Sequence, residues 1–196
     1  MGINTIARAT YRKMWFMKIA FVGKGGAGKT TLTALFARHL AATGHTVLAL
    51  DADINQNLAA ALGEDVDEAA PRPTLGERLD EIKAYLRGDN PRISSTAAMV
   101  KTTPPGRGSR LLRVVEDNPI WRRCVRDVGG VRLASTGGFE ESDLGVACYH
   151  SKVGAVELIL NHLVDTDDEY VLVDMTAGAD AFASGLFTRF DRTFIV

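Results

Sequence analysis

The sequence predicts an α/β fold of three layers, in which a mostly parallel sheet is flanked by helices. Short apolar stretches typical of buried strands alternate with stretches in which apolar residues recur at helical spacing. The first such unit has a strand at 18–22, a helix, and a strand at 46–50. A strand, a helix and a strand in this order imply parallel pairing and a right-handed crossover. The apolar positions of this helix are Leu32, Leu35, Phe36 and Leu40.

The alternation continues through the rest of the chain. Strands are predicted at 131–135 and 170–174. The amphipathic helix between them carries its apolar side chains at Val153, Val156, Leu160 and Leu163. Residues 193–196 have the pattern of a further core strand, but no helix follows that would cover it. We therefore expect the C-terminal part of the domain to be missing from this sequence.

Length and composition fit a single domain. The chain has 196 residues, 46% of them apolar, which is enough for one sizeable core. We expect this domain at 17–196, after a disordered extension at 1–16 that lacks the features of a secretory signal. Cys124, expected to pack in the core, and Cys148 form no CxxC pair, which favours a reducing cytoplasm. No stretch reaches the roughly 18 apolar residues of a membrane span, so we expect no integral membrane association.

The region from about 63 to 130 is predicted to be a variable insertion. A helix at 75–86 has Leu75, Leu79, Ile82 and Leu86 on one face, whereas the glycines and prolines of 104–108 indicate a loop. The net charge of the chain is −1, yet 101–132 contain eight Lys or Arg against three Asp or Glu. Such runs usually face water. The alternative is a docking site for an acidic partner protein or a phosphate-bearing ligand.

A glycine-rich loop follows the first predicted strand. Residues 23–30 match GxxxxGK[ST], a pattern in which main-chain N–H groups and a helix N-terminus surround phosphate oxygens. Lys29 is placed to bind the β- and γ-phosphates, and the Thr30 hydroxyl to complete the coordination of Mg²⁺. The sequence therefore predicts a nucleoside triphosphate site, with Mg²⁺. The residues predicted to bind this cofactor are Gly23, Lys24, Gly25, Gly26, Ala27, Gly28, Lys29, Thr30 and Thr31.

Carboxylates follow two other predicted strands. Asp51 and Asp53 lie two residues apart at the end of the second strand and project similarly. A carboxylate there can orient a water molecule, because phosphoryl transfer depends mainly on positioning and charge neutralisation. Asp174 ends the strand at 170–174 and is predicted to hold Mg²⁺ through water, while Gly178 lets the following backbone bend toward the γ-phosphate. Ordinary solvated or capping roles are the alternative for the first two carboxylates.

Lys24 adds a second lysine to the loop, and Gly-Lys-Gly-Gly resembles the signature of the deviant Walker A class of P-loop ATPases. This class includes the MinD and ParA proteins and the nitrogenase iron protein. The resemblance implies a P-loop NTPase fold, ATP as the nucleotide, and a homodimer in which Lys24 reaches the partner's phosphates. It also matches Asp53 to an aspartate near the attacking water, so the implied catalytic residues are Lys24, Lys29 and Asp53. A solvated loop lysine is the alternative for Lys24.

Several segments look most like the CooC family of carbon monoxide dehydrogenase maturation ATPases, which assist nickel insertion. The resemblance covers 18–62 and 131–196 but not the middle, and it implies a metalloenzyme as the client protein. That family carries a CxC pair, whose first cysteine is replaced here by Val146. Cys148 and His150 remain as candidate ligands for Zn²⁺ or Ni²⁺ across a two-fold axis. The alternative is a buried cysteine and a histidine that begins a helix.

Two further hypotheses stay open. One is a partitioning or positioning ATPase like ParA and MinD, which acts on DNA, a membrane or a partner protein. DNA binding needs a basic patch such as 107–126, but the balanced total charge makes nucleic acid the less expected partner. The other is an inactive nucleotide-binding module.

Overall fold

The structural layout comes from a computed structural model. One six-stranded sheet has the strand order β3-β4-β2-β5-β1-β6. Every neighbouring pair is parallel except β3 and β4, which are antiparallel. The strands are β1 (Met17–Val22), β2 (Thr46–Ala52), β3 (Arg126–Val128), β4 (Val131–Ser135), β5 (Glu169–Met175) and β6 (Arg192–Ile195). The structure describes residues 16–65, 71–138, 149–164, 166–178 and 186–196.

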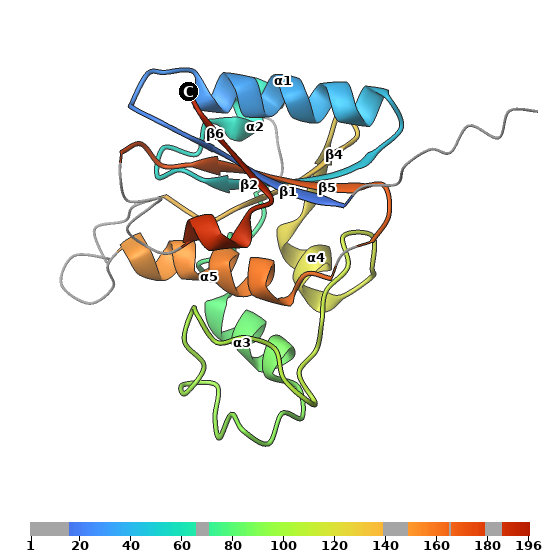
Figure 1. Cartoon of the computed structure of the whole chain (residues 1–196), viewed down its shortest axis with the longest axis vertical. Helices are drawn as coiled ribbons and strands as arrows, with labels where there is room; N and C mark the ends of the chain where they lie inside the picture. The colour runs from blue at the N-terminus through green and yellow to red at the C-terminus, as the bar shows by residue number, and fades with distance from the viewer. Residues whose placement is uncertain (1–15, 66–70, 139–148, 165, 179–185) are drawn as a thin grey trace, which may run out of the picture.

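Helices cover both faces of the sheet, so the predicted three-layer α/β fold is confirmed (Figure 1). On one face lie α1 and α2. On the other lie α4 and α5, with α3 farther out beyond α5 (Figure 1). The helices are α1 (Lys29–Ala42), α2 (Leu58–Leu62), α3 (Leu79–Arg87), α4 (Pro119–Cys124) and α5 (Tyr149–His162), and a 3₁₀-helix spans Leu186–Arg189.

The central strand β2 is buried on both faces. Val47 and Ala49 belong to the core cluster under α1, while Leu48 and Leu50 belong to the cluster around α5. Successive side chains of a strand point to opposite faces, so burial on both sides requires an unbroken apolar run. The polar residues that end this run therefore mark the edge where the strand leaves the core.

Helix α1 is present as predicted, but its buried face differs from the expected one. Leu32 and Leu35 are 43% and 58% exposed, and the side chains against the sheet include the small residues Ala34 and Ala37. The apolar residues of α1 are spaced so that either of two overlapping faces of the helix could pack against the sheet. Small residues allow the helix to approach the sheet closely. Leu40 is buried as predicted.

The helix predicted at 75–86 begins four residues later, at Leu79. The reason lies in the hydrogen bonds of the preceding turn. The N–H groups of Leu75 and Gly76 donate to the carbonyl oxygens of Ser135 and Thr136, 2.8 and 2.9 Å away, at the end of β4. These bonds tie the turn to the sheet and keep it out of the helix. Nothing in the sequence analysis anticipated α2, α4 or β3.

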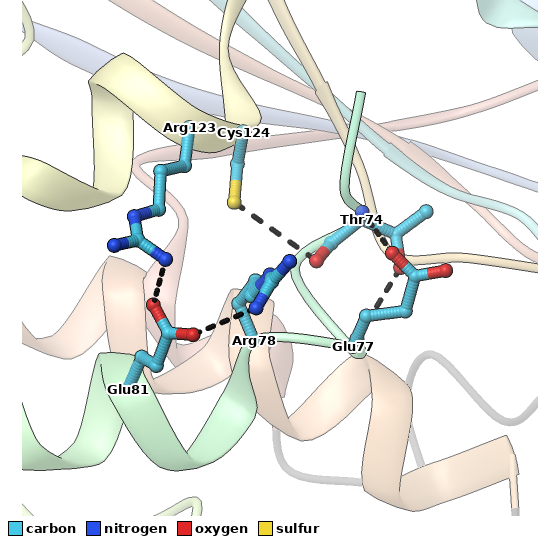
Figure 2. A network of polar contacts seen from close by, with 6 residues as sticks. All are labelled: Thr74, Glu77, Arg78, Glu81, Arg123 and Cys124. Atoms are coloured by element: carbon cyan, nitrogen blue, oxygen red, sulfur yellow. Dashed lines mark hydrogen bonds and ion pairs between the residues drawn. The ribbon is translucent and has the colours of Figure 1, made fainter. Parts of the chain in front are cut away.

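Figure 2 shows how α3 and α4 are joined. Glu81 of α3 accepts hydrogen bonds from Arg78 (2.8 Å) and from Arg123 of α4 (2.9 Å). Next to this network, the Cys124 thiol lies 3.9 Å from the carbonyl oxygen of Thr74. Cys124 is 2% exposed, and burial raises its pKa to about 11, so the thiol is uncharged at neutral pH. The prediction that Cys124 packs in the core is confirmed.

The last predicted strand is present as β6, but it is not a core strand among the described residues. It pairs with β1 on one side, and Phe194 and Ile195 are 48% and 78% exposed. The Phe194 ring still stacks on Phe21 of β1, with 5.5 Å between the ring centroids. The part of the chain that the structure describes contains no helix long and apolar enough to cross a membrane.

Candidate functional site

Three strand ends meet at one edge of the sheet. In the parallel register, Asp174 of β5 lies opposite Phe21 of β1 on one side and opposite Asp51 of β2 on the other. The glycine-rich loop begins at Gly23, directly after β1. Clefts for ligands form at the carboxyl ends of parallel strands in such sheets. The topology therefore brings the loop and the predicted carboxylates together.

The loop between β1 and α1 has the backbone geometry of an anion site. Gly26 and Gly28 have φ angles of 76° and 98°, in the left-handed region that glycine adopts without strain. Among the described residues, no neighbouring atom lies within 4 Å of the position that a Cβ would take at either residue, so these residues leave the space in front of the backbone open. Gly28 caps the N-terminus of α1, whose first turn contains no acidic residue. Its N–H groups and helix dipole therefore favour an anion.

Lys29 places its ammonium group inside this loop. The side chain is 5% exposed, and its Nζ donates to the carbonyl oxygen of Lys24 at 3.2 Å. That oxygen also accepts from the N–H of Ala27 at 3.2 Å. A buried ammonium group is costly unless it is paired with negative charge. The position of Lys29 thus fits phosphate oxygens bound in front of the loop.

Asp174 is a buried carboxylate that faces the same space. It is 0% exposed, and neither carboxylate oxygen has a hydrogen-bond partner within the described ranges. Burial raises its pKa to about 6; Thr30 and Lys29 act to lower the pKa, and Asp53 to raise it. An orphaned carboxylate beside a hydroxyl group is a suitable donor set for Mg²⁺, directly or through water. The residues present therefore fit this metal.

Asp51 and Asp53 occupy different surroundings. Asp51 is 0% exposed and accepts from the N–H groups of Asp53 (3.1 Å) and Leu58 (3.0 Å). Burial raises the pKa of Asp51 to about 7; these two bonds oppose the rise, and Asp174 and Asp53 add to it. Asp53 is 8% exposed, and its Oδ1 accepts from the N–H and the side-chain amide of Asn55 at 2.9 and 3.0 Å.

Three other predicted residues lie in the glycine-rich loop or close to it. Lys24 and Thr31 are exposed, so their side chains can reach a bound molecule or a second protein chain. Gly178, which follows β5 with a φ of 102°, donates its N–H to the carbonyl oxygen of Gly23 at 3.2 Å. The segment after Asp174 is therefore bonded directly to the start of the phosphate loop.

Thr136 is a site residue that the sequence analysis missed. Its N–H and hydroxyl groups both donate to the carbonyl oxygen of Asp51, at 2.9 and 3.1 Å. The available signal was Ser-Thr-Gly-Gly at 135–138, which starts at the last residue of the strand, because polar residues at the carboxyl end of a parallel strand share the edge with the other strand ends.

The proposed transition-metal ligands are not part of the described site. Cys148 lies outside the described residues, as does the side chain of His150. Within the described ranges, no group of three or more His, Cys, Asp or Glu residues is arranged to hold a metal ion. His162 is buried, and its Nδ1 lies 2.8 Å from the carbonyl oxygen of Leu158 within α5.

Comparison with known proteins identifies the family. A model of the CobQ/CobB/MinD/ParA nucleotide binding domain matches residues 19–180. This chain belongs to that family. The match runs from β1 to beyond β5, so the family domain includes the glycine-rich loop and the three strand ends around it.

Two curated relatives are similar in sequence to most of this chain. The carbon monoxide dehydrogenase accessory protein CooC of Rhodospirillum rubrum is 33% identical over 180 residues, which cover 92% of this chain and 62% of CooC. An uncharacterized ATP-binding protein of Methanocaldococcus jannaschii is 30% identical over 183 residues, with the same coverage of both chains. The chain thus spans about 62% of the length of these curated relatives.

The solved structures support the same fold. The septum site-determining protein MinD of Pyrococcus horikoshii OT3, in complex with Mg-ADP, superimposes with a TM-score of 0.53 at 20% identity. The match covers 93% of this chain and 58% of that chain. The chain is therefore a MinD/ParA-type nucleotide-binding domain by family, with a similar fold to MinD and a sequence similar to CooC.

Proposed function

We propose that this protein binds ATP with Mg²⁺ at the carboxyl edge of its sheet and hydrolyses it as a dimeric switch. One observation supports this most strongly. Lys29 and Asp174 bury opposite charges at the same edge, and the described residues give them little hydrogen bonding. Lys29 already acts on Asp174 as a nearby positive charge, and a nucleotide with its metal adds a phosphate anion for Lys29 and Mg²⁺ for Asp174.

Each group around the phosphate tail has a distinct role in this proposal. The N–H groups of residues 25–30, except that of Ala27, which is bonded within the loop, bind phosphate oxygens, and the Lys29 ammonium group neutralises the β- and γ-phosphates. Thr30 and Asp174 hold Mg²⁺, which neutralises charge on the transferred phosphoryl group when bound. Asp53 orients the attacking water molecule. The space in front of Gly26 and Gly28, where a Cβ would meet no atom of the described part of the chain within 4 Å, supports the placement of the phosphates.

Lys24 is the residue that links the proposed activity to a dimer. Its carbonyl oxygen is bonded inside the loop, but its side chain is exposed and belongs to none of the described ion pairs. In the proposed dimer, this ammonium group lies against the partner's phosphates and stabilises negative charge on the leaving group. Hydrolysis then removes the contact and opens the dimer.

The proposed client is a metalloenzyme. Support comes from the 33% identity to CooC, whose name places it with carbon monoxide dehydrogenase. The proposal includes one Zn²⁺ or Ni²⁺ ion held between two subunits by Cys148 and His150, which offer a thiolate and an imidazole each. The chemistry of these donors suits both metals, although Val146 removes one thiolate per subunit relative to a CxC pair.

The test uses the complete protein and measures its mass in solution with and without MgATP, together with its metal content. A nucleotide-dependent dimer with stoichiometric nickel or zinc is the expected result. A dimer without metal contradicts metal delivery and favours a partitioning or positioning ATPase, for which salt-sensitive DNA binding that requires ATP is the second readout. A protein that stays monomeric and does not turn over MgATP contradicts the switch itself.

A further inference from the structure

The carboxylate of Asp51 joins the two ends of the loop that carries Asp53. One carboxylate oxygen accepts from the N–H of Asp53, at the start of the loop. The other accepts from the N–H of Leu58, the first residue of α2, seven positions after Asp51. Each of the two oxygens of a carboxyl group can accept a hydrogen bond. Asp51 therefore clamps the loop at both ends with one side chain.

The loop needs such a clamp because it contains a strained residue. Gln56 has a φ of 49°, in the left-handed region that residues other than glycine adopt at a cost. Its N–H donates to the carbonyl oxygen of Asp53 at 3.2 Å, and the Asp53 carboxylate accepts from Asn55. All these bonds lie within the loop. The Asp51 carboxylate adds two bonds that connect the loop to the sheet.

Asp51 itself is held firmly. It lies within β2, with Ser135 of β4 and Asp174 of β5 as its register neighbours. Its carbonyl oxygen accepts from both the N–H and the hydroxyl of Thr136. The backbone of Asp51 is fixed in the central sheet, and its side chain is bonded to two main-chain N–H groups of the loop. Asp51 thus holds the loop in place relative to the sheet.

We propose that Asp51 is a positioning residue for ATP hydrolysis, which holds the loop 53–58 in the shape that aims the Asp53 carboxylate at the attacking water. This inference rests on the proposed function and assigns a role to a residue for which the resemblance implied none. Asp51 acts through Asp53, since its carboxylate is fully buried and both of its oxygens accept from main-chain N–H groups. Catalytic groups must lie within a fraction of an ångström of their productive positions, so a loosened loop lowers turnover more than it lowers binding.

The kinetic test compares Asp51→Asn with wild type in the complete protein. The amide keeps the shape of the side chain but has one acceptor oxygen, so one of the two clamp bonds is lost. We expect kcat for MgATP to fall about tenfold or more, with ATP affinity within about threefold of wild type. Asp127→Asn is the matched control, since Asp127 also accepts from a main-chain N–H, that of Gly130, in the β3–β4 turn. Its turnover is expected to stay at the wild-type level.

A double-mutant cycle separates positioning from a general structural effect. Once Asp53→Ala has removed the carboxylate that Asp51 aims, adding Asp51→Asn should reduce kcat no further. Independent, multiplicative losses in the double variant overturn the inference. A thermal unfolding scan of each variant shows whether it is folded at the assay temperature.

Hydrogen exchange provides a readout that does not depend on activity. In Asp51→Asn, the amide proton that loses its acceptor, that of Asp53 or that of Leu58, should exchange faster, while that of Leu32, bonded to the carbonyl oxygen of Gly28 at the start of α1, should be unchanged. Unchanged exchange at both loop positions overturns the clamp. If wild type fails to hydrolyse ATP while exchange responds as expected, the proposed function fails and the clamp stands as loop structure alone, without a role in hydrolysis.

Discussion

The carboxyl edge of the sheet and the α3–α4 region (residues 71–125) treat charge in opposite ways. At the edge, Lys29 and Asp174 are buried with little hydrogen bonding. In the α3–α4 region, the side chains that are buried completely include Leu75, Leu86 and Leu112, whereas the charges of Glu81 and its arginine partners lie in half-exposed ion pairs. A fully buried carboxylate with neither oxygen hydrogen-bonded costs stability, so Asp174 marks the edge as a candidate ligand site.

The largest expected effect concerns the exposed loop lysine. For Lys24→Ala, we expect ATP binding to be retained and MgATP turnover to fall about 10³-fold, the scale of a missing arginine finger. Steady-state turnover and equilibrium ATP binding of the complete protein measure the two quantities. Arg38→Ala, an exposed cation on α1, serves as control and should keep wild-type turnover. Preserved turnover in the Lys24 variant contradicts the contact across the dimer.

The α3–α4 region should show the reverse pattern, with an effect on stability alone. Leu86→Ala removes a side chain that is 0% exposed, which should lower the free energy of unfolding by about 2–5 kcal/mol. Leu111→Ala, at 46% exposure, is the matched control and should change it by less than about 0.5 kcal/mol. Denaturant unfolding measures both values. If Leu86→Ala weakens ATP binding while the protein is still folded, the α3–α4 region affects ligand binding as well as stability, which contradicts the comparison.

The buried carboxylates predict a pH dependence of stability without ligand. Burial raises the pKa values of Asp51 and Asp174 from 3.8 to about 7 and about 6, so between about pH 4 and pH 7 the folded protein binds more protons than the unfolded chain. The contribution of these groups to the free energy of unfolding therefore falls as pH rises through this window. Mg²⁺ affinity should change in the opposite direction and weaken below about pH 6, because Asp174 must be ionised to hold the metal.

Denaturant unfolding at pH 5 and pH 7.5 checks this dependence. Asp51→Asn should show a smaller loss of stability between the two pH values than wild type. An identical change in both proteins would mean that Asp51 titrates as it does in the unfolded chain.

The smallest expected effect lies in the network of Figure 2. Glu81→Gln weakens two ion pairs whose side chains are half-exposed, so stability should fall by only about 0.2–1 kcal/mol. High salt should reduce the difference between the variant and wild type, as unfolding curves at two salt concentrations can show. A loss above 2 kcal/mol would indicate that this network does more than join α3 to α4.

Much of the site was predictable because its signals are local. The glycine pattern at 23–30 and the carboxylates after buried strands both follow from short-range rules, and the structure brings Lys29, Asp53 and Asp174 to one edge. The roles assigned to these residues stay predictions. Which face of α1 is buried could not be predicted from apolar spacing. Packing against the sheet buries Ala34 and Ala37 and leaves Leu32 and Leu35 exposed.

Long-range hydrogen bonds explain the remaining differences. The late start of α3 depends on bonds from Leu75 and Gly76 to the end of β4, about 60 residues farther along the chain. The Thr136 contact to Asp51 likewise joins residues 85 positions apart. No local propensity encodes such pairings. The core strands were easier to predict, since a buried strand can be recognised from its own run of apolar residues.

Equilibrium binding of ATP to the complete protein, with wild type compared with Lys29→Ala in the presence of Mg²⁺, tests the central claim most directly. The account predicts saturable binding by wild type and a loss of affinity of at least about a hundredfold in the variant, because the buried ammonium group that meets the phosphates is gone. Equal affinity of the two folded proteins, or no binding by wild type, would contradict a phosphate site at this loop.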